Sequence, residues 1–206
     1  MVKVPLPPPT LDFDPTTDVH SGQPVLFRII RLGGSHPASW DSLRRFGPVP
    51  GMRFDPHLGQ PAIQSRGVMY ASPSFKTTFA EVFQRTRIIS DDSGATLAAW
   101  QPTRDLVLLD LTSDFLMRNG AAAALMMGPK GYSQHWAAAI ETQLGHQIDG
   151  LWHLSSMTSE PMVTLFERAA QVNSFPARPA FHRGLGDPLL GPYIAGAAES
   201  LGYGVR

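Results

Sequence analysis

GVMYASPSFKTTFAEV, residues 67–82, is the stretch of this sequence that predicts local structure most sharply. Its first six residues are mainly apolar and are typical of a short strand. Ser74 is a suitable helix N-cap, and the apolar residues after it fall on one helical face: Phe75, Phe79, Val82 and Phe83. Glu81 lies on the flank of that face. The stretch therefore predicts a strand that turns directly into an amphipathic helix carrying an acid beside its apolar stripe.

Other segments of the sequence have the patterns of strands or helices. Further strands are predicted at residues 24–32, 105–113, 148–156 and 161–169. Further helices are predicted after Ser39, within residues 112–120, at residues 132–145 and in the C-terminal segment up to Gly202. Because these elements show no regular βαβ order, they favour a single α+β domain with a mixed central sheet and flanking helices.

The first 23 residues are proline-rich and lack periodicity, which predicts an extended arm in front of a domain at residues 24–206. The N-terminus has no uninterrupted apolar run of the kind found in signal peptides. The longest apolar stretch, AAAALMMG, is too short to cross a bilayer. We therefore expect a cytoplasmic protein without membrane contact.

Composition excludes several classes of function. Lys and Arg together number 17, as do Asp and Glu, so no basic excess favours direct binding to nucleic acid. The absence of cysteine excludes a thiol nucleophile and a cysteine zinc site. The histidines never reach H-E-x-x-H spacing, so no metal is expected, and His57 and His153 are interpreted as packing or hydrogen-bonding residues. P-loop, G-x-G-x-x-G and G-x-S-x-G motifs are also missing.

What remains is a set of polar residues on apolar strands and elbows: Arg28, Arg53, Tyr70, Glu81, Ser155 and Ser156. Arg53 stands in FGPVPGMRFDPHLG, residues 46–59, where prolines and glycines predict a stiff loop and residues 52–54 suggest the start of a strand. Each residue taken singly also fits a surface charge or a turn. A functional interpretation of these residues therefore depends on whether they form one pattern together.

Together they carry a resemblance. The segments VLFRI, GMRFDP, GVMYASPSFKTTFAEV and DGLWHLSS occur in this order, and they resemble the RES-domain family over about residues 24–166. That family is named for an arginine, a glutamate and a serine, and its members are the toxins of Xre–RES toxin–antitoxin pairs. The resemblance implies a fold similar to ADP-ribosyltransferases and an enzyme that consumes NAD as its substrate.

By the same resemblance, Glu81 takes the role of the catalytic acid, Arg28 and Arg53 those of the arginines, Tyr70 that of the aromatic residue and Ser155 that of the serine. These residue types suit the chemistry. A carboxylate stabilises the positive charge that develops when the nicotinamide–ribose bond breaks. Arginine forks bind pyrophosphate oxygens. A tyrosine ring can stack on the nicotinamide or ribose, and a serine hydroxyl can bind the nicotinamide amide or ribose.

The sequence departs from the family pattern at two places. Ile29 follows Arg28 where an aromatic residue is frequent in the family, and Trp152 and His153 stand where a tyrosine and a proline are common. Trp152 or His153 is then a candidate for the missing aromatic surface of the nicotinamide pocket. The register also leaves open whether Ser155 or Ser156 is the serine of the motif.

The resemblance leaves the acceptor of ADP-ribose open between phosphate, water and a protein side chain. The alternatives are therefore an enzyme that depletes NAD, a protein mono-ADP-ribosyltransferase, and a binding module without catalysis. As partners the resemblance implies an Xre-type helix-turn-helix antitoxin and, within that complex, a homodimer of the toxin.

Overall fold

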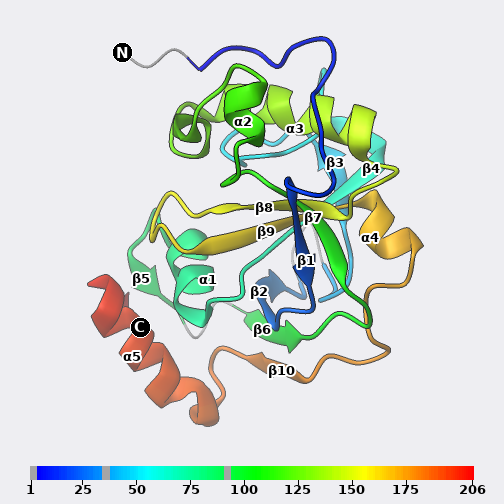
Figure 1. Ribbon diagram of the computed structural model, residues 1–206. Helices are drawn as coiled ribbons and strands as arrows, with labels where there is room; N and C mark the ends of the chain where they lie inside the picture. Colours follow the sequence, from blue (N-terminus) through cyan, green and yellow to red (C-terminus); the bar gives the residue numbers. More distant parts are fainter. Residues whose placement is uncertain (1–3, 34–37, 91–93) are drawn as a thin grey trace.

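A six-stranded mixed sheet organises the computed structural model, which describes residues 4–33, 38–90 and 94–206 (Figure 1). The strands follow the order β1-β7-β8-β9-β4-β3. Their bounds are β1 Val19–Gly22, β7 Leu106–Asp110, β8 Gly150–Leu154, β9 Pro161–Phe166, β4 Ala62–Ala71 and β3 Arg44–Gly47. β7 and β8 run parallel, and the other neighbouring pairs of this sheet run antiparallel.

Two smaller sheets complete the strand content of the described residues. β10 (Phe181–Gly184), β6 (Ala95–Trp100) and β2 (Leu26–Arg31) form an antiparallel sheet with β6 in the middle. β5 (Ile88–Ile89) and β11 (Gly204–Val205) form a short parallel pair near the C-terminus.

The helices flank these sheets (Figure 1). They are α1 Phe75–Val82, α2 Phe115–Arg118, α3 Lys130–Leu144, α4 Glu167–Gln171 and α5 Gly191–Leu201, with the 3-10 helices η1 Ala123–Met126 and η2 Pro188–Leu190. α2, η1 and α3 lie in the crossover that joins the parallel strands β7 and β8, a connection that cannot be a tight turn. In the described part of the chain, no helix has both the length and the apolar character needed to cross a membrane.

The core has three parts. Strand side chains alternate between two faces, so the large sheet contributes to two clusters, and the smaller sheet shares one of these and contributes to a third. Leu151 and Phe166 face α3 and pack near Trp136. Val163 and Leu165 of β9 face the other way, toward Leu26 and Trp100 of the smaller sheet. A third cluster joins that smaller sheet to α1 and α5, with the fully buried Phe79 among its members. The two larger sheets therefore pack face to face, with helices outside them.

The segment before β2 is packed against the rest of the chain. Val4 and Leu11 are buried in the core beside α3. The indole nitrogen of Trp136 donates a hydrogen bond to the carbonyl of Pro5 at 2.9 Å, and the backbone N–H of Leu11 donates to Gln143 at 3.0 Å. β1 then pairs with β7 at the edge of the large sheet.

The predicted α+β class with a mixed central sheet is confirmed. The strand and helix predicted from residues 67–82 are present as the end of β4 and as α1, and the Ser74 hydroxyl accepts a hydrogen bond from the Thr77 N–H as an N-cap should. The helix predicted at residues 132–145 is α3. The C-terminal helix ends at Gly202, whose φ of 64° is left-handed and suits glycine.

Two local predictions are wrong. Residues 38–43 form turns instead of a helix, because Ser39 bonds to Ser42 and Asp41 and the chain then continues into β3; residues 34–37 lie outside the described residues. No strand begins at residues 52–54, because Phe54 has a left-handed φ of 56° that breaks any extended run. β6 was not predicted, since its residues ATLAAW are all buried and show no alternation.

Gly150→Ala is expected to destabilise the protein severely. A Cβ atom at Gly150 would lie 2.0 Å from the Thr164 carbonyl oxygen and 2.8 Å from the Leu165 Cα, so β8 and β9 could not keep their pairing. We expect the free energy of unfolding, measured in urea, to fall by about 3 kcal/mol or more. Gly184→Ala in β10 is the control, because no atom lies within 4 Å of its Cβ. Equal losses in the two variants would contradict this account.

Candidate active site

Glu81 and Ser155 form the centre of the candidate site. Glu81 lies at the end of α1, and Ser155 follows directly after β8. The Ser155 hydroxyl donates to Glu81 Oε1 at 2.6 Å and accepts the backbone N–H groups of Met157 and Thr158 at 3.0 and 3.2 Å. Ser155 is buried, whereas Glu81 is partly exposed. The serine therefore fixes one carboxylate oxygen, and within the described residues Oε2 has no hydrogen-bond partner.

A second contact docks the β8–β9 turn on the start of α1. Glu160 Oε2 accepts hydrogen bonds from the hydroxyls of Ser74 and Thr77 at 2.5 and 2.6 Å, and Glu160 Oε1 pairs with Lys76 at 2.5 Å. The Lys76 ammonium and these hydroxyls lower the pKa of Glu160 to about 2. The Ser155 N–H donates to the carbonyl of Glu160. Sequence reasoning missed Glu160, because its partners lie more than 80 residues away in the chain.

Arg53 lies within electrostatic reach of Glu81. Burial lowers the pKa of Arg53, and the negative charge of Glu81 acts in the opposite direction. The guanidinium Nη1 donates to the carbonyls of Leu125 and Gly128 at 3.2 and 2.8 Å. The crossover between β7 and β8 therefore holds this arginine in place.

The loop that carries Arg53 is attached to α3. Lys130 Nζ donates to the carbonyl of Gly51 at 2.6 Å, and Gln134 Nε2 donates to the carbonyls of Val49 and Met52 at 3.1 and 2.9 Å. These bonds fix the backbone directly before Arg53. The predicted stiffness of the loop thus has a specific source in side chains of the helix.

Buried Asp55 anchors the other side of the same loop. Its carboxylate accepts from the Val49 N–H at 2.8 Å, from Arg44 at 3.0 Å and from His57 Nδ1 at 2.5 Å. Burial alone would raise the pKa of Asp55, but the N–H of Val49, the charge of Arg44 and the hydrogen bonds from His57 outweigh it and lower the pKa. His57 is therefore a buried structural partner of this carboxylate.

Tyr70 points toward the Asp55 anchor. Its hydroxyl is buried and has no well-formed hydrogen bond among the described residues. Burial and the charge of Asp55 raise its pKa, and nearby Arg44 acts in the opposite direction. Tyr70 therefore lies near the Asp55–Arg44 pair that anchors the Arg53 loop.

Arg28 supports a different loop. Its Nη1 donates to the carbonyls of Ser39, Trp40 and Ser42 at 3.3, 3.0 and 2.9 Å. Burial lowers its pKa to about 10, and the charge of Asp41 opposes this shift. The structure therefore gives Arg28 main-chain partners in the segment before β3.

Trp152 and His153 lie on opposite faces of β8, as neighbours in a strand must. Trp152 stacks on His20 of β1 with ring centroids 3.8 Å apart. His153 is buried on the other face, where its ring packs against that of Phe54 with centroids 4.6 Å apart. The His153 Nδ1 contacts the Leu154 carbonyl, which can only accept, so Nδ1 carries the proton and Nε2 accepts from the Thr164 hydroxyl at 2.9 Å.

The structure thus brings Arg53, Glu81, Ser155 and His153 together, while Trp152 lies on the far face of the strand and Arg28 binds a separate loop. Of the two candidate serines it is Ser155 that contacts Glu81, and Ser156 is exposed. No cluster of side chains suited to a metal occurs among the described residues.

In this α+β protein the end of β8 meets a helix-borne acid, and an arginine lies within electrostatic reach of that acid. The sequence model of the RES domain matches residues 25–183, and the chain therefore belongs to the RES domain family. The family predicted from the sequence is confirmed.

Comparison with solved structures finds the Mycobacterium tuberculosis MbcT–MbcA toxin–antitoxin complex. The similarity has a TM-score of 0.58 at 16% identity and covers 86% of this chain and 92% of that chain. At this level of identity the likeness concerns the fold. No curated protein matches the sequence.

His153 should make stability depend on pH. Burial lowers its pKa to about 4; the hydrogen bond to Leu154 opposes this shift, and the charge of Arg53 adds to it. In the unfolded chain the pKa is near 6.5, so below that pH the unfolded state binds a proton that the native state excludes. Stability should therefore fall between about pH 6.5 and pH 4, by roughly 2 kcal/mol at pH 4.5 from this residue.

The test compares urea unfolding at pH 7 and pH 4.5 in the wild type and in His153→Gln. The variant cannot titrate at this position, so its loss of stability between the two pH values should be smaller by roughly 2 kcal/mol. His135→Gln, at an exposed position of α3, should behave like the wild type. An unchanged pH dependence in His153→Gln would show that the buried imidazole is not responsible.

Proposed function

We propose that this protein is the toxin of a toxin–antitoxin pair and that it cleaves the nicotinamide–ribose bond of NAD. In this proposal ADP-ribose passes to phosphate or water, and the cell loses NAD. The observation that carries the proposal is the hydrogen bond between Ser155 and Glu81, with Arg53 in electrostatic reach. Membership of the RES domain family supports it.

The geometry suits this bond cleavage. When the bond breaks, its electron pair goes to the nicotinamide ring nitrogen and positive charge develops on the ribose. A carboxylate held in a fixed orientation stabilises such a charge without having to reorient. Ser155 holds Glu81 Oε1, which leaves Oε2 for a ribose hydroxyl or for the incoming acceptor. The acceptor then bonds to the ribose carbon and releases its proton.

The surrounding residues take supporting roles in this proposal. His153 packs against Phe54 of the Arg53 loop, and Tyr70 lies near the Asp55–Arg44 pair that anchors this loop. In this proposal both residues act on the substrate through Arg53. Trp152, which stacks on His20, has no supporting role in this proposal.

For the partner, we infer an antitoxin of the Xre helix-turn-helix type, with a homodimer of the toxin in the complex. The solved structure that shares this fold is described as a toxin–antitoxin complex, which supports an antitoxin partner here. The proposal also places the protein in the cytoplasm, where NAD and the antitoxin would be found.

Glu81→Gln should abolish most of the activity. The amide keeps the size of the side chain but loses the negative charge, so NAD consumption should slow by about 10²- to 10⁴-fold. The measurement follows NAD by NMR in purified protein freed of antitoxin, with and without phosphate, and the ADP-ribosyl product identifies the acceptor. Glu199→Gln, at an exposed position of α5, is the control and should retain wild-type activity.

Three results would count against this proposal. Intact NAD in the wild type, with and without phosphate, would exclude NAD depletion. A discrete labelled protein band after incubation of labelled NAD with lysate would instead assign a protein acceptor. Activity that tolerates Glu81→Gln would remove the catalytic role of the Glu81–Ser155 pair. A binding module that has lost catalysis would instead bind NAD and leave it intact in the wild type.

A further inference from the structure

The two arginines implied by the resemblance already have partners inside the protein. Arg28 Nη1 contacts three main-chain carbonyls and Arg53 Nη1 contacts two. An arginine fork that holds carbonyls has fewer donors left for phosphate oxygens. Other positively charged groups are therefore candidates for recognising the two phosphates of the proposed substrate.

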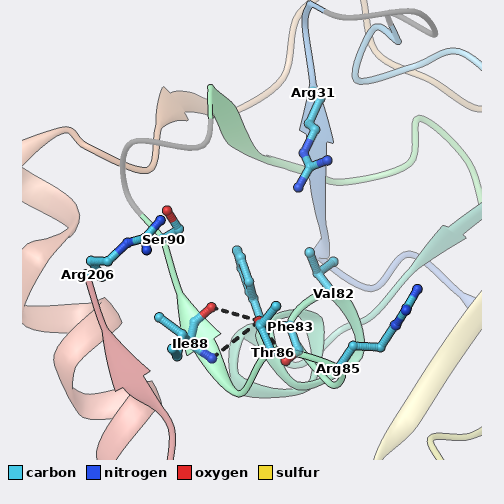
Figure 2. A pocket seen from close by; sticks show the side chains of 8 residues that line it. All are labelled: Arg31, Val82, Phe83, Arg85, Thr86, Ile88, Ser90 and Arg206. Carbon is cyan, nitrogen blue, oxygen red and sulfur yellow. Dashed lines mark hydrogen bonds between the residues drawn. The ribbon is translucent and has the colours of Figure 1, made fainter.

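A pocket of about 670 Å³ lies between the end of β2, the end of α1 and the β5–β11 pair (Figure 2). Its volume is in the range of small-molecule sites. Eight described residues line it: Arg31, Val82, Phe83, Arg85, Thr86, Ile88, Ser90 and Arg206. Three of them are arginines, and no acidic residue is among these eight.

The three arginines reach the pocket from different elements. Figure 2 shows Arg31 extending into the space from β2, Arg206 reaching in beside Ser90, and Arg85 leaving the turn after α1 on the other side of the helix. All three side chains are exposed, and none forms an ion pair within the described residues. Their positive charges are therefore available to an anion.

This pocket adjoins the candidate active site. Val82, which lines it, directly follows Glu81 in α1. Arg85 stands in the turn that follows α1, four residues after Glu81 in the chain. A ligand whose ribose contacts Glu81 would therefore have the arginine pocket next to it.

We infer that the pocket holds the diphosphate group of the nucleotide whose ribose contacts Glu81, an inference that rests on the proposed function. Arg31 and Arg85 bind the phosphate oxygens, since guanidinium forks match them in geometry and charge. The guanidinium of Arg206 reaches into the pocket beside Ser90. The apolar side chains of Val82, Phe83 and Ile88 form the floor beneath the diphosphate.

The test measures binding of inorganic pyrophosphate and of ADP-ribose by calorimetry at fixed ionic strength. In the double variant Arg31→Ala, Arg85→Ala, both ligands should bind at least about 50-fold more weakly, because two charge-assisted contacts are lost. Arg178→Ala is the matched control: this arginine is exposed but does not line the pocket, and its affinities should stay within about twofold of wild type.

Two results would overturn the inference: wild-type protein that binds no pyrophosphate, or a double variant that binds it as well as the wild type. The outcome is separable from that of the proposed function. If the wild type leaves NAD intact but binds pyrophosphate through Arg31 and Arg85, NAD cleavage is excluded and the diphosphate pocket stands.

Discussion

The arrangement of the site depends on the docking of the β8–β9 turn along one flank of α1. Glu160 in the turn binds Ser74 and Thr77 in the first part of the helix, and Ser155 binds Glu81 at its end. Ser74, Thr77 and Glu81 fall on one side of the helix, because their spacing follows its period. With both ends of the helix attached to one turn, α1 can neither rotate nor slide, and the Glu81 carboxylate stays fixed relative to the large sheet.

The position of Glu81 on the flank of α1 could be predicted from the sequence, but the turn that docks against this flank could not. The apolar stripe of α1 places Glu81 to one side by periodicity alone, and the strand before the helix has a clear pattern. Glu160 gives no local signal, since it lies in a polar turn and acts on residues far away in the chain. β6 was missed for a related reason, because complete burial removes the alternation by which a strand is recognised.

The internal bonds of the arginines could not be predicted either. Resemblance assigns Arg28 and Arg53 to the substrate, yet their carbonyl partners come from loops whose positions only the folded chain sets. The prolines near Arg53 predict a stiff loop, and the structure adds the larger cause, which is the hydrogen bonding of that loop by Lys130, Gln134 and buried Asp55.

The separation of Glu81 and Ser155 in the chain has a consequence for synthesis. The two residues are 74 positions apart, and the crossover that anchors Arg53 lies between them. At typical translation rates the acid leaves the ribosome about 4 to 15 s before the serine. During that interval the nascent chain lacks β8, β9 and the turn that fixes Glu81. A growing polypeptide therefore has no organised Glu81–Ser155 pair until nearly all of its large sheet has been made.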